Sequence, residues 1–274
     1  MKLYYRISDK SYEKQKLIGA TKEVCLKNFC DVFHDHLNSL TVIADNCDDA
    51  TVKMLKSNCC CVIETNDGNA GSFRTALNLS LKNDEDELIY MVEDDYLHRA
   101  ESASLLQEGI KRADYVTLYD HPDKYTRHYD GGEFSKVIKT ASSHWRYTTS
   151  TCMTFASKVK TLKQDMDVWK EFTSGDHPYD HFVFKKLTDE RKRRLSVCIP
   201  GAACHTDLTF SASVNQILID PWAIEMMIQQ REKDLENSSS DFKEMKNSFL
   251  KQKTGWEKLV ALDALFKSSI DNKK

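Results

Sequence analysis

Short apolar runs alternate with stretches of helical spacing over the first two-thirds of the chain. Runs of about four to eight apolar or β-branched residues are typical of buried strands, and apolar residues spaced at i, i+3 and i+4 are typical of helices. The expected strands cover residues 2–7, 40–44, 60–64, 88–92 and 115–118, and the expected helices cover residues 21–37, 48–56, 72–81 and 101–113. This alternation predicts an α/β fold with a mixed, mainly parallel central sheet flanked by helices.

The pattern changes after residue 119, where a polar and aromatic loop runs to residue 134. Strands are expected at 136–140, 148–155 and 195–199, with helices at 157–172 and 178–187. From residue 221 onward the spacing is helical, with a hydrophilic break at 236–241. We therefore predict one domain over residues 1–220 and a helical extension over 221–274 packed on it. A dimer contact is the alternative role of that extension, so the chain is expected to be a monomer or a weak dimer.

The composition limits which binding partners and which cellular compartment are expected. The formal net charge is −3, which gives no indication of nucleic-acid binding. There is no run of about 18 apolar residues, so no transmembrane segment is expected, and the first residues lack the apolar core of a signal peptide. The nine cysteines are odd in number and have no paired C-x-x-C spacing. They indicate reduced, buried thiols of a cytoplasmic protein rather than disulfides or a zinc site.

Three acids end the fourth expected strand, in the stretch Glu93-Asp94-Asp95. Ligands of parallel α/β sheets bind beyond the carboxyl ends of the strands, so this position favours a site. Side chains alternate along an extended chain, which puts Glu93 and Asp95 on one face and points Asp94 elsewhere. Two carboxylates on one face suit a divalent cation that a diphosphate also ligates. The alternative is a solvated acidic turn.

Four further elements carry candidate chemistry. Asp45 ends the second strand and is placed to accept a hydrogen bond from a base N–H, while Asp48 suits a helix N-cap. The glycine-rich turn at 64–71 precedes a helix from residue 72, in which Arg74 is in reach of a phosphate or a buried carboxylate. Asp180, or failing that Asp176, lies where a general base is expected, although both acids would also favour a helix N-terminus. His205 follows a strand and is a third possible ligand, which favours Mn²⁺ over Mg²⁺.

Taken in order, these elements resemble the GT-A class of nucleotide-sugar glycosyltransferases, over about three-quarters of the chain. The resemblance implies a Rossmann-like fold and a uridine site formed by Tyr5, Arg6 and Asp45. It places a DxD-type motif on Glu93-Asp94-Asp95, with Asp95 and His205 as the metal ligands. Arg74, Glu93 and Asp94 are then expected on the UDP-sugar side. Glu93 would approach the ribose or a metal-bound water, and its place at the first motif position departs from the strict pattern.

The whole chain also looks like a small glycosyltransferase of large algal (chlorella) viruses. That narrower resemblance implies a UDP-glucose-like donor, a glycan or glycoprotein acceptor and a location in the host cytoplasm. The resemblance to the GT-A class implies Asp180, or failing that Asp176, as general base, and such a base is expected to give inversion at the anomeric carbon; if neither acid faces the sugar, a retaining route is open. The loop at 119–134 and Trp145 are expected on the acceptor side, although Trp145 suits the core better.

Two other functions stay open at this point. A sugar-nucleotide nucleotidyltransferase shares the α/β core, but it usually carries a glycine-rich phosphate loop after the first strand, and residues 4–14 contain no glycine. A catalytically weak or inactive protein that binds nucleotide sugars or glycans is the non-enzymatic alternative. Release of UDP in the presence of acceptors separates it from an active transferase.

Overall fold

The computed structural model describes residues 1–10, 15–125, 132–208, 219–238, 242, 250 and 253–271. The chain forms two compact units. The first contains Met1–Glu13 and Cys25–Cys204, and the second contains Lys14–Val24 and His205–Lys274. The division at residue 220 expected from the sequence stays a prediction.

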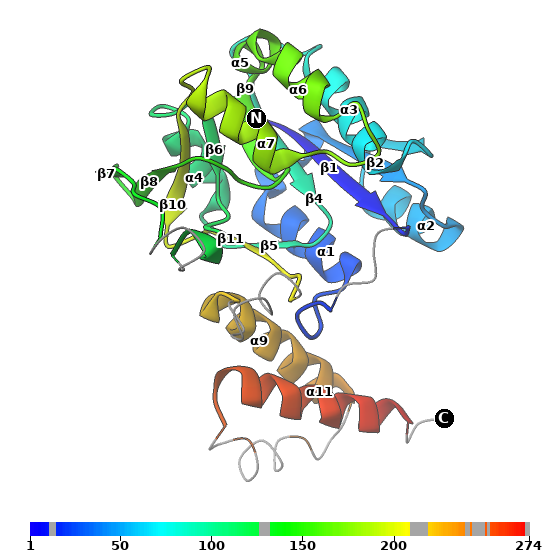
Figure 1. Cartoon of the computed structure of the whole chain (residues 1–274). Helices are drawn as coiled ribbons and strands as arrows, with labels where there is room; N and C mark the ends of the chain where they lie inside the picture. The colour runs from blue at the N-terminus through cyan, green and yellow to red at the C-terminus, as the bar shows by residue number, and fades with distance from the viewer. Residues whose placement is uncertain are drawn as a thin grey trace. The chain divides into compact units, whose positions relative to one another are not determined.

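The first unit is built on a nine-stranded sheet with the order β3-β2-β1-β4-β9-β6-β10-β8-β7 (Figure 1). Its strands are β1 (Lys2–Ser8), β2 (Leu40–Asp45), β3 (Val62–Thr65), β4 (Leu88–Glu93), β6 (Tyr115–Thr117), β7 (Val137–Lys139), β8 (His144–Thr148), β9 (Phe155–Lys158) and β10 (Leu195–Ile199). β9 is antiparallel to β4 and β6, and β8 is antiparallel to β10 and β7, so within the described chain these two strands oppose the other seven. The mixed, mainly parallel sheet is confirmed.

Helices cover both faces of this sheet (Figure 1). They are α1 (Lys22–Val32), α2 (Asp49–Asn58), α3 (Gly68–Ser80), α4 (Ser102–Gly109), α5 (Val159–Gln164), α6 (Met166–Phe172) and α7 (Asp180–Asp189), with 3-10 turns η1 (His34–Ser39) and η2 (Pro122–Tyr125). Successive residues of β1 enter different cores. Tyr5 packs with Phe29 of α1, whereas Tyr4 lies in the core of Phe73 and Trp169. This alternation is what a strand covered on both faces requires.

Two expected helices have different bounds in the structure. The helix expected over 21–37 ends at Val32 and continues as η1. α3 begins at Gly68, so the glycines assigned to a turn form the first turn of the helix instead. Gly68 has a φ of +73°, and a Cβ on Gly71 would lie 2.5 Å from Asp67 Cβ. Gly68 therefore provides the left-handed backbone conformation at the start of the helix, and Gly71 leaves room for the Asp67 side chain.

The strand expected over 148–155 and the helix expected over 157–172 are each divided. Residues 149–154 form a loop between β8 and β9, in which the Thr151 hydroxyl donates to Thr117 Oγ1 at 3.0 Å. Buried hydroxyls of this kind give the chain partners outside the strand ladder. The helical stretch is interrupted at Asp165, which is fully buried and accepts from Tyr115 Oη at 2.8 Å and Arg193 Nε at 2.9 Å.

The second unit contains α9 (Pro221–Ser238) and α11 (Gly255–Asp271), which confirms the helical pattern of the C-terminal part (Figure 1). Arg231 links the two helices, with its guanidinium 2.8 Å from Asp263 and 4.6 Å from the centre of the Phe266 ring. Part of the expected break at 236–241 lies outside the described residues. None of the described helices is long and apolar enough to cross a bilayer.

Trp145 lies in the core of the first unit rather than on a surface open to a sugar. The ring is buried against Gly109, where an added Cβ would stand 2.6 Å from the indole, and its Nε1 donates to Thr140 Oγ1 at 2.7 Å. Of the two roles considered for Trp145, the structure supports the core.

We predict that Gly109→Ala lowers the free energy of unfolding by about 1–3 kcal/mol, because the new methyl group overpacks the indole. Urea unfolding followed by far-UV circular dichroism measures this. Gly175→Ala is the matched control, since nothing lies within 4 Å of an added Cβ there. Equal stabilities of the two variants would contradict the packing described for Trp145.

His98, in the short strand β5 (Tyr96–His98), is fully buried between aromatic rings. β5 pairs with β11 (Ala203–His205) in a second, two-stranded sheet. Tyr90 Oη lies 2.8 Å from His98 Nε2. Burial lowers the pKa of His98 from 6.5 to about 3, so the folded protein holds a neutral imidazole.

Because the unfolded chain binds this proton more readily, His98 stabilises the fold fully above pH 6.5, and that stability is lost as the pH falls toward 3. The difference in unfolding free energy between wild type and His98→Gln should therefore fall by about 1.4 kcal/mol per pH unit below pH 6. Urea titrations at several pH values measure it. A difference that does not change with pH would contradict the burial of a neutral His98.

Candidate functional site

The candidate site lies at the carboxyl ends of three neighbouring parallel strands. β1 pairs with β2 on one side and with β4 on the other, and the register sets Arg6 beside Glu93 and Ser8 beside Asp45. Parallel strands end at the same edge of a sheet, so side chains far apart in the sequence meet there.

Arg6, near the end of β1, connects the end of β4 to the first turn of α3. Its Nη2 donates to Glu93 Oε1 at 3.2 Å and to Asn69 Oδ1 at 2.8 Å, and its guanidinium lies 5.3 Å from the centre of the Phe73 ring. Arg6 is only 8% exposed, so its charge needs these partners. Sequence reasoning treated Asn69 only as part of a turn, because nothing local shows that its side chain reaches a cation.

Asp45 is 3% exposed and holds the segment after β3. Its Oδ1 accepts from Thr65 Oγ1 at 2.9 Å and from the Asp67 amide at 2.8 Å, and its Oδ2 accepts from Asn46 Nδ2 at 2.9 Å. The uridine role expected for Asp45 stays a prediction. In the structure this carboxylate joins the end of β2 to residues 65–67, which follow β3 and precede α3.

Two other residues expected at the site are directed into the protein. Asp94 is buried and accepts from the Ser8 amide at 3.2 Å, which ties β4 to the end of β1. Tyr5 is fully buried against Phe29, at 5.1 Å between ring centres, and it offers no surface to a base. Burial raises the pKa of Tyr5 well above its usual value. Neither residue is part of the function proposed below.

Cys152 lies in the loop between β8 and β9. Burial raises the pKa of its thiol well above the ordinary value, and the charges of Asp180, Glu93 and Asp95 raise it further. The end of β4 and the segment before α7 are connected by the first turn of α3, where Asn69 accepts from Arg6, the partner of Glu93, and the Ala70 amide donates to the Asp176 carbonyl. Sequence reasoning missed Cys152, because it falls in a segment that was expected to be a strand.

The start of α3 fixes the segment that leads into α7. The Ala70 amide donates to the Asp176 carbonyl at 3.1 Å, and Arg74 Nη1 donates to the Thr173 carbonyl. Arg74 thus binds backbone oxygens in this structure, and its expected role toward a phosphate stays a prediction. The Asp176 side chain is exposed, whereas Asp180 is the first residue of α7 and is partly buried.

The donor atoms near Cys152 suit a divalent cation held jointly with a substrate. Glu93 and Asp95 are hard oxygen ligands, which Mg²⁺ and Mn²⁺ prefer. Among the residues that the structure describes, no three His, Cys, Asp or Glu side chains are grouped as a metal site. A cation there would need oxygens from a bound diphosphate. His205 is buried and belongs to the second unit, and its role as a ligand stays a prediction.

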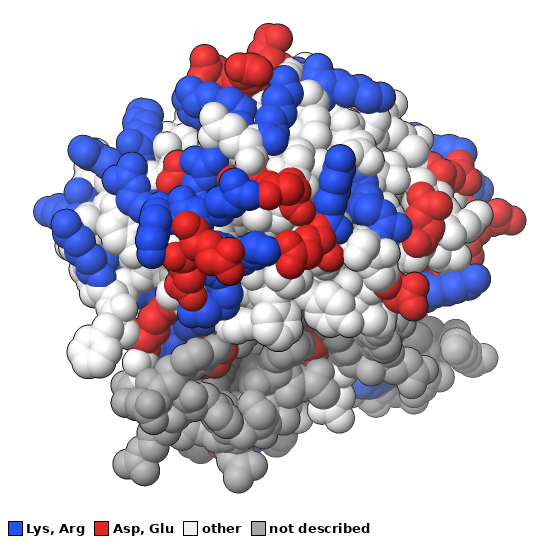
Figure 2. Space-filling model, turned by 45° about the horizontal axis from the view of Figure 1, so that its top comes forward, with Lys and Arg blue, Asp and Glu red and all other residues white. Residues whose placement is uncertain are grey.

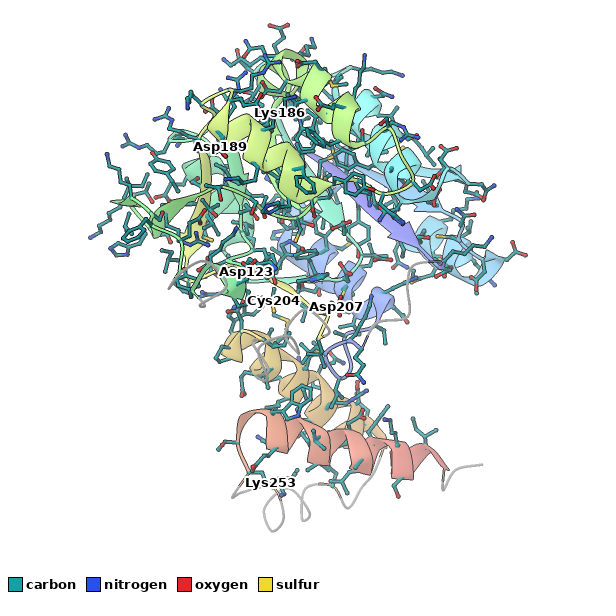
Figure 3. All side chains as sticks on the ribbon, in the orientation of Figure 1. Asp123, Lys186, Asp189, Cys204, Asp207 and Lys253 are labelled. Carbon is teal, nitrogen blue, oxygen red and sulfur yellow. The ribbon has the colours of Figure 1, made fainter. Side chains whose placement is uncertain are left out.

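Acidic and basic side chains are interspersed over the face of the molecule that Figure 2 shows. On α7, Lys186 and Asp189, both labelled in Figure 3, likewise carry opposite charges one turn apart. Such mixed charge gives no positive stripe on this face of the kind that nucleic-acid-binding proteins present.

Comparison with known proteins gives distant likenesses. No family model and no curated protein matches the chain. Among solved structures it is similar to S. aureus TarS, with 15% identity over 100% of this chain and 82% of that chain, at a TM-score of 0.45. It is also similar to CMP:2-keto-3-deoxy-manno-octonic acid synthetase in complex with CTP, with 10% identity over 78% and 95% of the two chains and a TM-score of 0.45.

A third similar structure is the galactosyltransferase LgtC in complex with donor and acceptor sugar analogues. Its identity is 11% over 68% of this chain and 69% of that chain, and its TM-score is 0.38. At these values the likenesses carry no conclusion about the activity of this chain. The narrower resemblance to algal virus enzymes stays a prediction.

We predict that Asp45→Ala lowers the free energy of unfolding by about 1–3 kcal/mol, because Thr65 and the Asp67 amide lose their buried acceptor. Chemical denaturation measures the change, with the exposed Asp35→Ala as control. If Asp45 served a ligand alone, its replacement would leave the stability of the free protein unchanged.

Proposed function

We propose that the chain is a metal-dependent glycosyltransferase that moves a sugar from a UDP-sugar to a hydroxyl of a glycan or glycoprotein acceptor. One observation supports this most: Glu93 and Asp95 lie at the carboxyl end of β4, and the first turn of α3 connects that end, through Arg6 and Asn69, to the segment that leads into Asp180 of α7. Paired acids on a strand end suit a cation and a diphosphate, and an acid on a facing helix suits a base.

The role proposed for each residue follows from its position in the site. Glu93 and Asp95 would hold Mn²⁺ or Mg²⁺ together with the donor diphosphate. The cation, when bound, supplies Lewis-acid stabilisation of the charge on the departing UDP. Arg6 orients Glu93 through their ion pair, and Asn69 holds Arg6 in place. Such fixed contacts favour binding of the diphosphate, because charges held in place need little reorganisation.

Asp180 is the proposed general base. It would accept the proton of the acceptor hydroxyl as the oxygen attacks the anomeric carbon, which inverts the configuration there. Asp180 is preferred over Asp176 because it is the first residue of α7 and is partly buried, whereas the Asp176 side chain is exposed. The donor sugar is expected to be glucose-like.

The test measures UDP release from a panel of UDP-sugars with and without Mn²⁺. Asp95→Asn should abolish the dependence on Mn²⁺, and Asp180→Asn should lower kcat by about 10²–10⁴-fold with donor binding retained. Matched controls are Asp86→Asn at the opposite end of β4 and Asp189→Asn on α7, both exposed carboxylates. The controls should retain full turnover.

Three results would overturn the proposal. Turnover of Asp180→Asn at the wild-type rate would exclude this residue as the base. A donor affinity that is unchanged both by Mn²⁺ and by Asp95→Asn would exclude a metal from donor binding. Release of pyrophosphate from a nucleoside triphosphate and a sugar phosphate, with no UDP release, would instead indicate a nucleotidyltransferase.

A further inference from the structure

The loop after β6 carries an exposed aromatic ring that the protein holds rigidly. Tyr125, the last residue of η2, is 56% exposed. Its hydroxyl donates to Asp120 Oδ2 and accepts from Arg146 Nε at 3.1 Å, and the Arg146 guanidinium lies 5.2 Å from the ring centre. An exposed tyrosine normally rotates freely. The contacts with Asp120 and Arg146 instead hold this ring at both its face and its hydroxyl.

The anchor of Tyr125 is a buried ion network. Arg146 is 4% exposed and bonds Asp120 Oδ1 through Nε at 2.9 Å and Nη2 at 2.6 Å. Its Nη1 donates to Glu133 Oε2 at 2.8 Å, and Glu133 also accepts from Thr148 Oγ1 at 2.7 Å. Burial of the hydroxyl and the Asp120 charge raise the pKa of Tyr125 to about 12, so the phenol keeps its proton at neutral pH. Such a network costs desolvation energy and is rigid once it is satisfied.

This turn adjoins the proposed site. Asp123, labelled in Figure 3, and Lys124 both act on the pKa of His181, which follows Asp180 on α7. Lys124 Nζ also donates to Ser150 Oγ at 2.6 Å, two residues before Cys152. The turn that carries Tyr125 is thereby bound to the loop before β9, whose Thr149 carbonyl accepts from Thr188 Oγ1 of α7 at 3.4 Å.

We propose that Tyr125 is a stacking platform for a pyranose ring of the acceptor and that Arg146 is its positioning residue; this rests on the proposed glycosyl transfer. The C–H face of a sugar is apolar and suits the face of an aromatic ring. Since the ring is already fixed, a bound sugar need not immobilise it, and preorganisation of this kind favours binding. Phe134 is 103% exposed, and within the described part of the chain no ion pair or hydrogen bond holds its ring.

The test follows acceptor kinetics, with methyl and p-nitrophenyl glycosides as the acceptor panel. Tyr125→Ala should raise the acceptor KM by about tenfold, which corresponds to about 1.4 kcal/mol. The kcat, the donor KM and donor hydrolysis without acceptor should stay within about twofold of wild type. Tyr125→Phe keeps the ring but loses the hydroxyl anchor, so an intermediate KM is expected. Val137→Ala is the control, because Val137 is similarly exposed, at 57%, and should leave the KM unchanged.

A second readout separates this inference from the proposed activity. Saturation-transfer NMR with a mixture of methyl glycosides should show transfer from wild-type protein to the C–H protons of the sugar ring. In Tyr125→Ala this transfer should be clearly reduced. If wild type releases no UDP, but saturation transfer to the sugar is seen in wild type and lost in Tyr125→Ala, then the proposed glycosyl transfer is wrong and the sugar platform is supported. Equal transfer in both proteins, no transfer in wild type, or an unchanged acceptor KM in Tyr125→Ala would overturn the platform.

Discussion

The buried ion pair between Arg6 and Glu93 is the constraint on which the arrangement of the site depends. A guanidinium that is almost fully buried must be paired, and Glu93 and Asn69 are the partners that the structure gives it. The pair joins the ends of β1 and β4 to the start of α3. The same first turn of α3 binds the Asp176 carbonyl, so the position of α7 follows from it.

The strands and the acids at their ends were predictable, since apolar runs and the residues that terminate them are local features. The strand over 195–199 has the predicted bounds, and Asp48 caps α2 as expected, accepting from the Thr51 amide at 2.8 Å. The start of α3 and the loop at 149–154 were predicted incorrectly. Both depend on contacts with residues distant in sequence, and glycine or threonine spacing does not reveal such contacts.

Burial decides which acids and aromatics face a ligand, and the local sequence does not encode it. Asp45 and Tyr5 stand at strand positions that favour a site, but one supports the next segment and the other fills the core. Cys152 has no sequence signal of any kind. It lies in the loop that returns the chain from β8 to β9.

The most direct test of a single site between β4 and α7 is amide hydrogen–deuterium exchange followed by peptide mass spectrometry, with and without saturating UDP-glucose and Mn²⁺. Bound donor should slow exchange in peptides that contain Glu93 and Asp95 and in peptides that contain Asp180. Peptides from α11 provide the internal reference and should be unchanged. Equal exchange of the Glu93 and Asp180 peptides with and without donor would place the ligand elsewhere and contradict the proposed site.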